Sequence, residues 1–565
     1  MSILDWVVLI LTLSGIISYG VMKSRGQHGA DTYLVADRKM PWYIVLLGVM
    51  ATQASAITFL SAPGQAYTDG MRFVQYYFGL PLAMVVICIS FIPIFQKLKV
   101  YTAYEFLEQR FDRKTRLLTA TLFLLSRGLS TGISIYAPSI ILSSILGWNI
   151  YITNIITGGL LIIYTFTGGA KAIAHTQKLQ FLIILSSMAI AGYMVIAKLP
   201  EGFGFSDALY VAGKSGKLNV ITTSFDWKDK YNIWSGIIGG FFLALSYFGT
   251  DNSQVGRYLT ARDTRESRLG LLFNGLVKVP MQFSILLIGA LLFAFYSFYH
   301  APVSFNEAAY NNLKKKTPEL VRSIEHDYGN LHADYQQQAL SIVKNKEQTG
   351  QELINSFLVT ENMINHLRDS VQHMISKHVS EQDSNDTNYI FLYFVKHSLP
   401  KGLVGLLFAV IFLAAWGSIS AALNSLAASS LMDVQLLAQQ IPPSQDKQLW
   451  LGRMHTLFWG IFCIAVAMFA TKIGSLIEAV NVLGSLFYGT ILGIFLVAFY
   501  LKKINGTSVF VAAIVTELLI VFIYMMNIIS FLWLNMIGAL LVIIISAIGN
   551  HLFRKNKEAQ SNNMP

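Results

Sequence analysis

Three charged residues lie within long apolar segments of this sequence. Arg127, Asp251 and Lys278 each stand among aliphatic, aromatic or small residues. A charge inside a membrane span is costly to bury and is therefore a candidate for function. Two interpretations stay open. Asp251 forms a structural ion pair with Arg127 or with Lys278, or the excess of positive charge attracts an anionic solute.

Two stretches of small and polar residues lie within apolar segments of the same kind, at Ala51–Thr58 and Gly249–Gln254. A membrane helix normally satisfies its own backbone. An ion or solute site at mid-depth therefore needs a broken helix, whose freed carbonyls face a cation and whose half-helix N-terminus faces an anionic group. The alternative is close packing of helices through small residues.

The elements that must position these residues are membrane helices. The chain is 54% hydrophobic and only 13% charged, against about 25% charged in soluble domains. Apolar runs of about 20 residues, enough to cross a bilayer, recur along the chain and predict an all-α polytopic membrane protein with about thirteen transmembrane helices. The predicted spans are 5–22, 43–64, 76–96, 117–146, 150–169, 179–198, 233–256, 270–299, 399–431, 452–471, 475–501, 508–526 and 528–552.

The positions of lysine and arginine predict the orientation in the membrane. With the N-terminus outside, the inner loops carry most basic residues, and the basic tail at Arg554, Lys555 and Lys557 is cytoplasmic. The formal net charge of +11 then reflects topology, so the lipid bilayer is the expected partner and nucleic acid is not. We expect a multi-pass protein of the cell (inner or plasma) membrane.

Three motifs carry a resemblance to a known family. They are Thr165-Phe-Thr-Gly-Gly-Ala-Lys-Ala-Ile-Ala-His-Thr-Gln-Lys-Leu-Gln180, predicted to be a cytoplasmic loop, the stretch Ser246–Ala261, and Leu423-Asn-Ser425. Together they resemble the sodium/solute symporter family. The resemblance implies a five-plus-five inverted-repeat transporter core, in which spans two to six match spans seven to eleven.

The predicted domain division follows from this resemblance and from one polar segment. Residues 301–390 have mixed charge and helical spacing of apolar residues. They predict an extracytoplasmic helical insertion, either a solvated spacer or an element for partner docking or gating. The predicted regions are a peripheral first span at 1–42, the first repeat and start of the second at 43–300, the insertion at 301–398, the rest of the second repeat at 399–501, and peripheral last spans with the tail at 502–565.

The resemblance also implies a sodium site. The family's carbonyl ligands fall on Ala51, Ala54 and Ala414, and these contacts do not depend on side-chain identity. The family's two adjacent hydroxyl ligands fall on Gly417 and Ser418, so only Ser418 keeps its hydroxyl. Hard oxygen ligands of this kind suit Na⁺ as the transported coupling ion.

A second sodium is not expected. Family members with a second sodium site have a carboxylate where this chain has Gln177. A neutral amide offers an oxygen but no charge, which predicts one sodium per solute.

Several residues are implied as solute contacts. Sugar-binding members of the family place a glutamate at Tyr77 and a glutamine at Thr58, so the sugar-binding set is not reproduced here. They share a lysine at Lys278, and Glu478 lies close to one of their substrate-contacting glutamines. The predicted substrate-binding residues are Thr58, Gln75, Tyr76, Tyr77, Arg127, Asp251, Lys278 and Glu478.

The function expected from all of this is sodium-coupled symport of a small polar organic solute by alternating access, with an anion favoured. The alternatives are a sodium-coupled sugar or polyol symporter, and a proton-coupled transporter that uses Asp251. A receptor that kept the fold without transport is a further possibility of another class. No nucleophile motif or metal-spaced cluster favours an enzyme, and Cys88 and Cys463 lie in apolar spans as core residues.

Overall fold

The structure is a computed structural model that describes residues 1–24, 39–98, 102–346, 350–379, 384–438, 444–470 and 475–562. Within these residues the chain is helical, and a single isolated bridge joins Met40 to Ala261. This is the expected outcome for apolar segments in lipid, because only intrahelical hydrogen bonds satisfy the backbone there.

Helices lie at every predicted span. Among the described residues, nine helices are long and apolar enough to cross a membrane, and shorter apolar helices lie at the remaining predicted positions. The protein is thus an all-helical, multi-span membrane protein. The helices are α1 (Ile3–Ser24), α3 (Trp42–Gln53), α4 (Ala56–Asp69), α5 (Leu80–Val86), α6 (Ile92–Leu98), α7 (Glu105–Arg110), α8 (Arg113–Leu146), α9 (Ile150–Ala197), α10 (Phe205–Lys214), α11 (Gly240–Gly249), α12 (Asn252–Leu259), α13 (Thr264–Phe298), α14 (Glu307–Lys316), α15 (Pro318–Lys344), α16 (Gln351–His378), α17 (Ile390–Ser398), α18 (Leu403–Ser429), α19 (Gln445–Phe469), α20 (Leu476–Tyr500), α21 (Gly506–Met525) and α22 (Phe531–Asn562).

Two spans are broken where the small polar stretches predict. Between α3 and α4, Ala54 leaves the helical region (φ −79°, ψ 66°) and Ser55 is extended. Between α11 and α12, Asp251 is extended and its carboxylate accepts the Ser253 N–H at 2.7 Å, which caps α12. The two predicted helix breaks are confirmed.

The structure corrects one local prediction. The stretch 165–180, predicted to be a loop, lies within the continuous helix α9. The Gly168-Gly169 pair is followed by alanine and lysine, which favour helix, and a glycine costs only about 1 kcal/mol within one. The side chains of residues 167–175 lie outside the described part of the chain.

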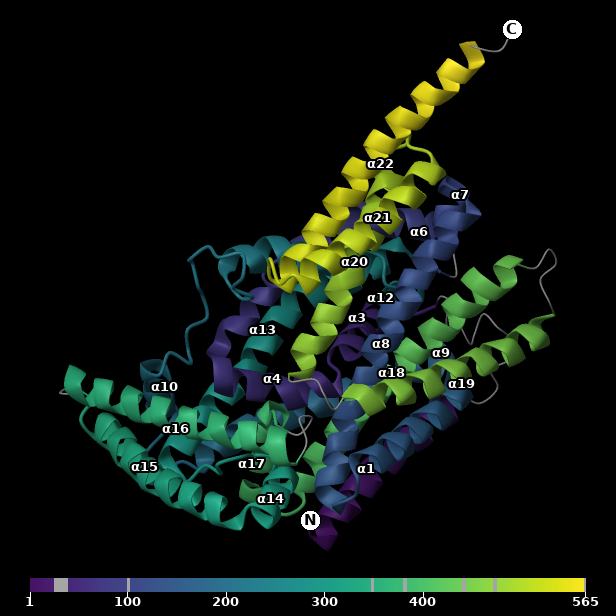
Figure 1. The fold of residues 1–565 in the computed structure, drawn as a ribbon. Helices are drawn as coiled ribbons and strands as arrows, with labels where there is room; N and C mark the ends of the chain where they lie inside the picture. The colour runs from purple at the N-terminus through teal and green to yellow at the C-terminus, as the bar shows by residue number, and fades with distance from the viewer. Residues whose placement is uncertain are drawn as a thin grey trace.

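The insertion is helical, as predicted, and lies at one end of the bundle (Figure 1). Its helices α15 and α16 pair, with the rings of Tyr335 and Phe357 stacked at 4.6 Å. The segment before α17 lies against α4 so closely that a Cβ at Gly64 would overlap the carbonyl of Thr387. The N-terminus lies at this same end, and α22 projects from the other.

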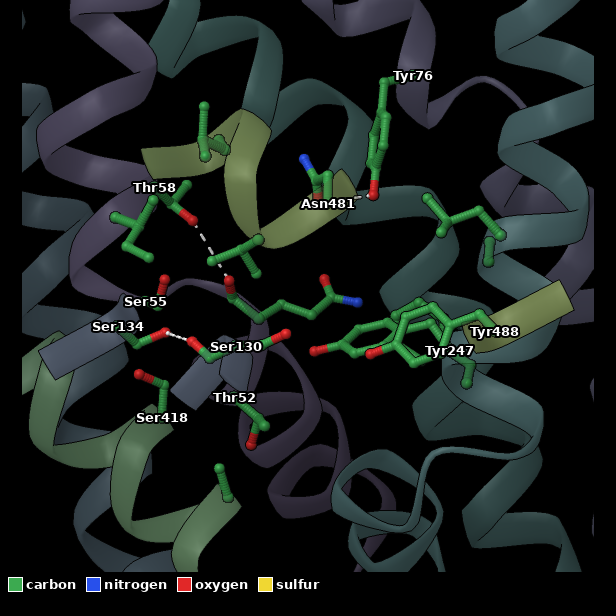
Figure 2. Close-up of a pocket in the computed structure, with 18 of the residues that line it drawn as sticks. Thr52, Ser55, Thr58, Tyr76, Ser130, Ser134, Tyr247, Ser418, Asn481 and Tyr488 are labelled. Carbon is green, nitrogen blue, oxygen red and sulfur yellow. Dashed lines mark hydrogen bonds between the residues drawn. The ribbon is translucent and has the colours of Figure 1, made fainter. Parts of the chain in front are cut away.

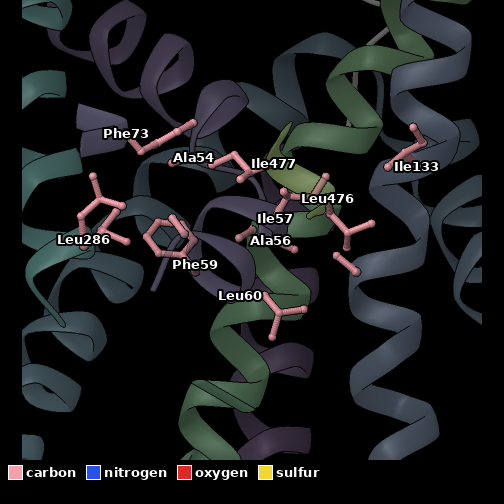
Figure 3. Packing of buried hydrophobic residues seen from close by; sticks show 14 of the residues in the cluster. Ala54, Ala56, Ile57, Phe59, Leu60, Phe73, Ile133, Leu286, Leu476 and Ile477 are labelled. Carbon is pink, nitrogen blue, oxygen red and sulfur yellow. The ribbon is translucent and has the colours of Figure 1, made fainter. Parts of the chain in front are cut away.

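Apolar packing holds the broken helix α4 in the middle of the bundle. Phe59 and Leu60 are fully buried, and Figure 3 shows them beside Leu286 of α13 and Leu476 of α20. The start of α4 is therefore held by α13 and α20.

Candidate functional site

The break between α3 and α4 borders a cavity of about 130 Å³ in the centre of the bundle, and the last turn of α11, just before the second break, also lines it. Figure 2 shows its polar side chains converging from several helices. Two groups stand apart in this view. Hydroxyls of Ser55, Ser130, Ser134 and Ser418 gather on one side, and the rings of Tyr247 and Tyr488 lie on the other.

The serine hydroxyls present oxygen lone pairs. Ser130 donates to the Ser126 carbonyl at 2.8 Å and Ser134 to the Ser130 carbonyl at 2.9 Å, each one helical turn back. Ser418 does the same toward Ala414, at 2.9 Å. Because the proton is engaged in the helix, each oxygen has lone pairs left for a cation or a donor.

The predicted sodium ligands are carbonyl and hydroxyl oxygens of α3, α18 and the residue that follows α3. Among the described residues, no backbone N–H donates to the carbonyls of Ala51 or Ala54, because α3 ends between them. Ala414 is buried in α18, and Ser418 lines the cavity one turn further along that helix. Carbonyl and hydroxyl oxygens from α3 and α18 suit Na⁺.

The amide group of Gln177, in α9, contacts both α3 and α18. Its side chain is fully buried, and Nε2 donates to the Gly417 carbonyl at 3.0 Å and to Thr52 Oγ1 at 3.4 Å. The Gln177 amide nitrogen thus links α9 to α3 and α18.

The structure decides between the two ion pairs. Arg127 Nη1 lies 4.0 Å from Asp251 Oδ2, which also accepts the Tyr488 hydroxyl at 2.9 Å. Lys278 is 1% exposed. Its Nζ lies 5.2 Å from the Tyr77 ring centroid, and no described carboxylate is within ion-pair distance.

Five of the predicted substrate residues line the cavity: Thr58, Tyr76, Tyr77, Arg127 and Lys278. The other three do not.

Gln75 is buried beside the cavity, bonded to the Tyr231 carbonyl and the Thr222 N–H. Asp251 caps the N-terminus of α12 and does not line the cavity. Glu478 pairs with Lys230 and borders a different cavity. Sequence position alone does not show which way these side chains turn on their helices.

Several lining residues were not predicted. Asn481 accepts the Tyr76 hydroxyl at 2.9 Å, and Tyr247 and Tyr488 form the aromatic side of the cavity. The sequence does indicate the cavity-lining face of α8, because the polar residues Arg127, Ser130 and Ser134 recur every three to four positions in an apolar helix.

Comparison with known proteins agrees with this architecture. The sodium/sialic acid symporters NanT of Aliivibrio fischeri and SiaT of Proteus mirabilis are each 25% identical to this chain over 98% of its length, covering 94% and 96% of the relatives. Human sodium-coupled monocarboxylate transporter 1 is 31% identical over 58% of this chain and 53% of its own.

A solved structure of a Na⁺-coupled sialic acid symporter in a substrate-bound, outward-open state has the same fold. The TM-score is 0.75 over 98% of both chains, at 22% identity. The sodium:solute symporter family model matches residues 33–328 and 354–516, which is most of the chain. The chain therefore belongs to the sodium:solute symporter family and is a sodium-coupled solute transporter, not an enzyme.

Proposed function

We propose that this protein carries a small organic anion together with sodium, by alternating access. The observation that carries this is Lys278, a buried lysine that lines the cavity and has no carboxylate partner among the described residues. A buried charge without a partner is costly. A solute carboxylate would supply the missing countercharge, whereas a neutral sugar would not.

The broken helices supply the second part of the proposal. Sodium binds the carbonyls of Ala51, Ala54 and Ala414 and the hydroxyl of Ser418. The solute carboxylate lies beside Ser55, at the positive N-terminal end of α4. The sodium ion and the solute both contact the break between α3 and α4. Each therefore raises the affinity of the protein for the other by the same factor.

The transport core is proposed to be a five-plus-five inverted repeat. In support, the breaks fall at corresponding places, in the first span of each half. The N-terminus and the insertion lie at one end of the bundle, which suits both being outside the cell and the C-terminus being cytoplasmic.

One sodium per solute is proposed. The amide nitrogen of Gln177 donates to the Gly417 carbonyl and to Thr52. The carboxylate that a second cation would require is missing.

Uptake into proteoliposomes tests the proposal. The panel is L-lactate, sialic acid and nicotinate, with glucose and mannitol as neutral solutes, each in sodium or in choline at fixed pH. We expect sodium-dependent uptake of a carboxylate, with a Hill coefficient for sodium near one. Uptake of the neutral solutes alone would refute the proposal, and uptake that persists in choline but follows a proton gradient would favour the proton-coupled alternative.

A further inference from the structure

A second cavity, of about 370 Å³, lies between the insertion and the ends of the membrane helices. Its walls come from α4, α13, α15 and α16 and from the start of α20. We call it the outer cavity.

The outer cavity lies in line with the central one. Thr58 borders the central cavity and Gln65, two turns along α4, borders the outer one. Between them, Ser61 of α4 lies within 3.4 Å of Ser475, oxygen to oxygen, at the start of α20. Ile57 and Ile477 border the central cavity just below this contact, and Figure 3 shows them among the apolar side chains packed there. The Ser61–Ser475 contact and these apolar side chains separate the two cavities.

Four buried polar atoms in the outer cavity have no hydrogen-bond partner among the described residues. They are Arg368 Nη1, Tyr296 Oη, His332 Nδ1 and Glu361 Oε2. The exposed fractions are only 7% for Arg368, 4% for Tyr296 and 2% for His332. Buried polar groups are almost always bonded to protein or to ordered water, so a set of four in one cavity indicates that water or a ligand binds there.

Three of the four atoms belong to groups that donate. His332 Nε2 accepts the Ala301 N–H at 3.2 Å, so the neutral ring carries its proton on Nδ1. Burial lowers the pKa of His332 to about 4, so the ring is neutral at physiological pH. Arg368 is fixed by Asp386, which it contacts at 2.9 Å through Nη2, leaving Nη1 free to donate. Guanidinium, imidazole and phenol donors together suit a carboxylate.

Five acids line the outer cavity, and all of them except Asp369 contact a described partner. Asp386 is held by Arg368, Asp69 by Gln65, and Glu478 by Lys230. Glu361 Oε1 lies 3.7 Å from Lys217 Nζ. Its Oε2 is left as an acceptor, which suits a hydroxyl on the same ligand.

From these positions we infer that the outer cavity is a binding site for a hydroxylated carboxylate, occupied by the transported solute before it enters the central cavity. This inference rests on the proposed function, because it takes the solute to be an organic anion. The insertion is thereby part of the binding machinery, since it contributes Arg368, His332 and Glu361.

The key variant is Tyr296→Phe, which removes only a hydroxyl that has no partner. Its thermal stability should equal that of the unmodified protein. Loss of stability would show that the hydroxyl has a structural role and would overturn the inference. Tyr210→Phe is the matched control, because its hydroxyl bonds the Lys346 carbonyl outside the cavity.

The binding assay uses a Lys278→Met background, in which the central site is weakened. L-lactate should still bind this variant and should bind more tightly than propionate, which lacks the hydroxyl. Adding Tyr296→Phe should weaken the remaining lactate binding about tenfold, the effect of losing one hydrogen bond to a charged group. Adding Tyr210→Phe instead should leave lactate binding unchanged.

The outcomes separate the two proposals. If the unmodified protein transports lactate, but Lys278→Met binds none or Tyr296→Phe has no effect, the inference is overturned and the proposed function stands. If the unmodified protein neither binds nor transports lactate while neutral solutes are taken up, both the proposed function and the outer-cavity site are refuted.

Discussion

Replacement of Lys278 by methionine tests the electrostatic reasoning most directly. The side chain keeps its length and loses its charge at a position that is 1% exposed and borders the central cavity. Two effects of opposite sign follow. The protein should become more stable, because an unpaired buried charge is removed. Affinity for an anionic solute should fall, because its countercharge is gone.

The size of the second effect follows from Coulomb's law. A carboxylate about 5 Å from Nζ, at an effective dielectric constant of about 20, gains about 3 kcal/mol. This corresponds to a loss of affinity of about 100-fold to 200-fold in Lys278→Met. Lys278→Arg, which keeps the charge, should lose much less.

The assay measures KM for the transported carboxylate in proteoliposomes at saturating sodium, together with the thermal unfolding of each variant. Lys278→Met should raise KM and raise the melting temperature. If KM changes less than about threefold while the protein stays folded, Lys278 does not serve as the countercharge. A lower melting temperature would show that the ammonium has a structural partner and would refute the reasoning.

Three further predictions concern other parts of the molecule. Ser418→Ala should weaken sodium activation of uptake strongly and change solute affinity at saturating sodium much less; unchanged sodium dependence would contradict the assigned site. Arg127→Gln should abolish uptake while Arg127→Lys keeps a part of it, and equal uptake by both would leave Arg127 only as the structural partner of Asp251. Outside the membrane, hydrogen bonds from His397 and Lys396 lower the pKa of Glu307 to about 2, below its usual value of about 4.3. The stability this adds is present above pH 5 and lost as pH falls toward 2, so hydrogen exchange in α14 should quicken on acidification, and Glu307→Gln should remove that response.

Local sequence was sufficient to predict most of the helices and both breaks, although it did not predict that 165–180 is helical. Lipid forces apolar runs into helices, and the stretch Ala51–Thr58 combines small and polar residues that allow a helix to open. The same holds at Asp251, whose short carboxylate caps the next helix. Both features depend on neighbours in the chain, so they can be recognised without the fold.

The arrangement of the buried charges was decided by tertiary structure. Arg127 and Asp251 are more than a hundred residues apart and meet because α8 packs near the α11–α12 break. Lys278 of α13 lines the cavity with no carboxylate partner in the part of the chain that the structure describes. Gln75 and Glu478 also have suitable types and positions, but their helices turn them toward the Tyr231 carbonyl and Lys230. The rotation of each helix about its axis is set by packing against all its neighbours, and that information is spread over the whole chain.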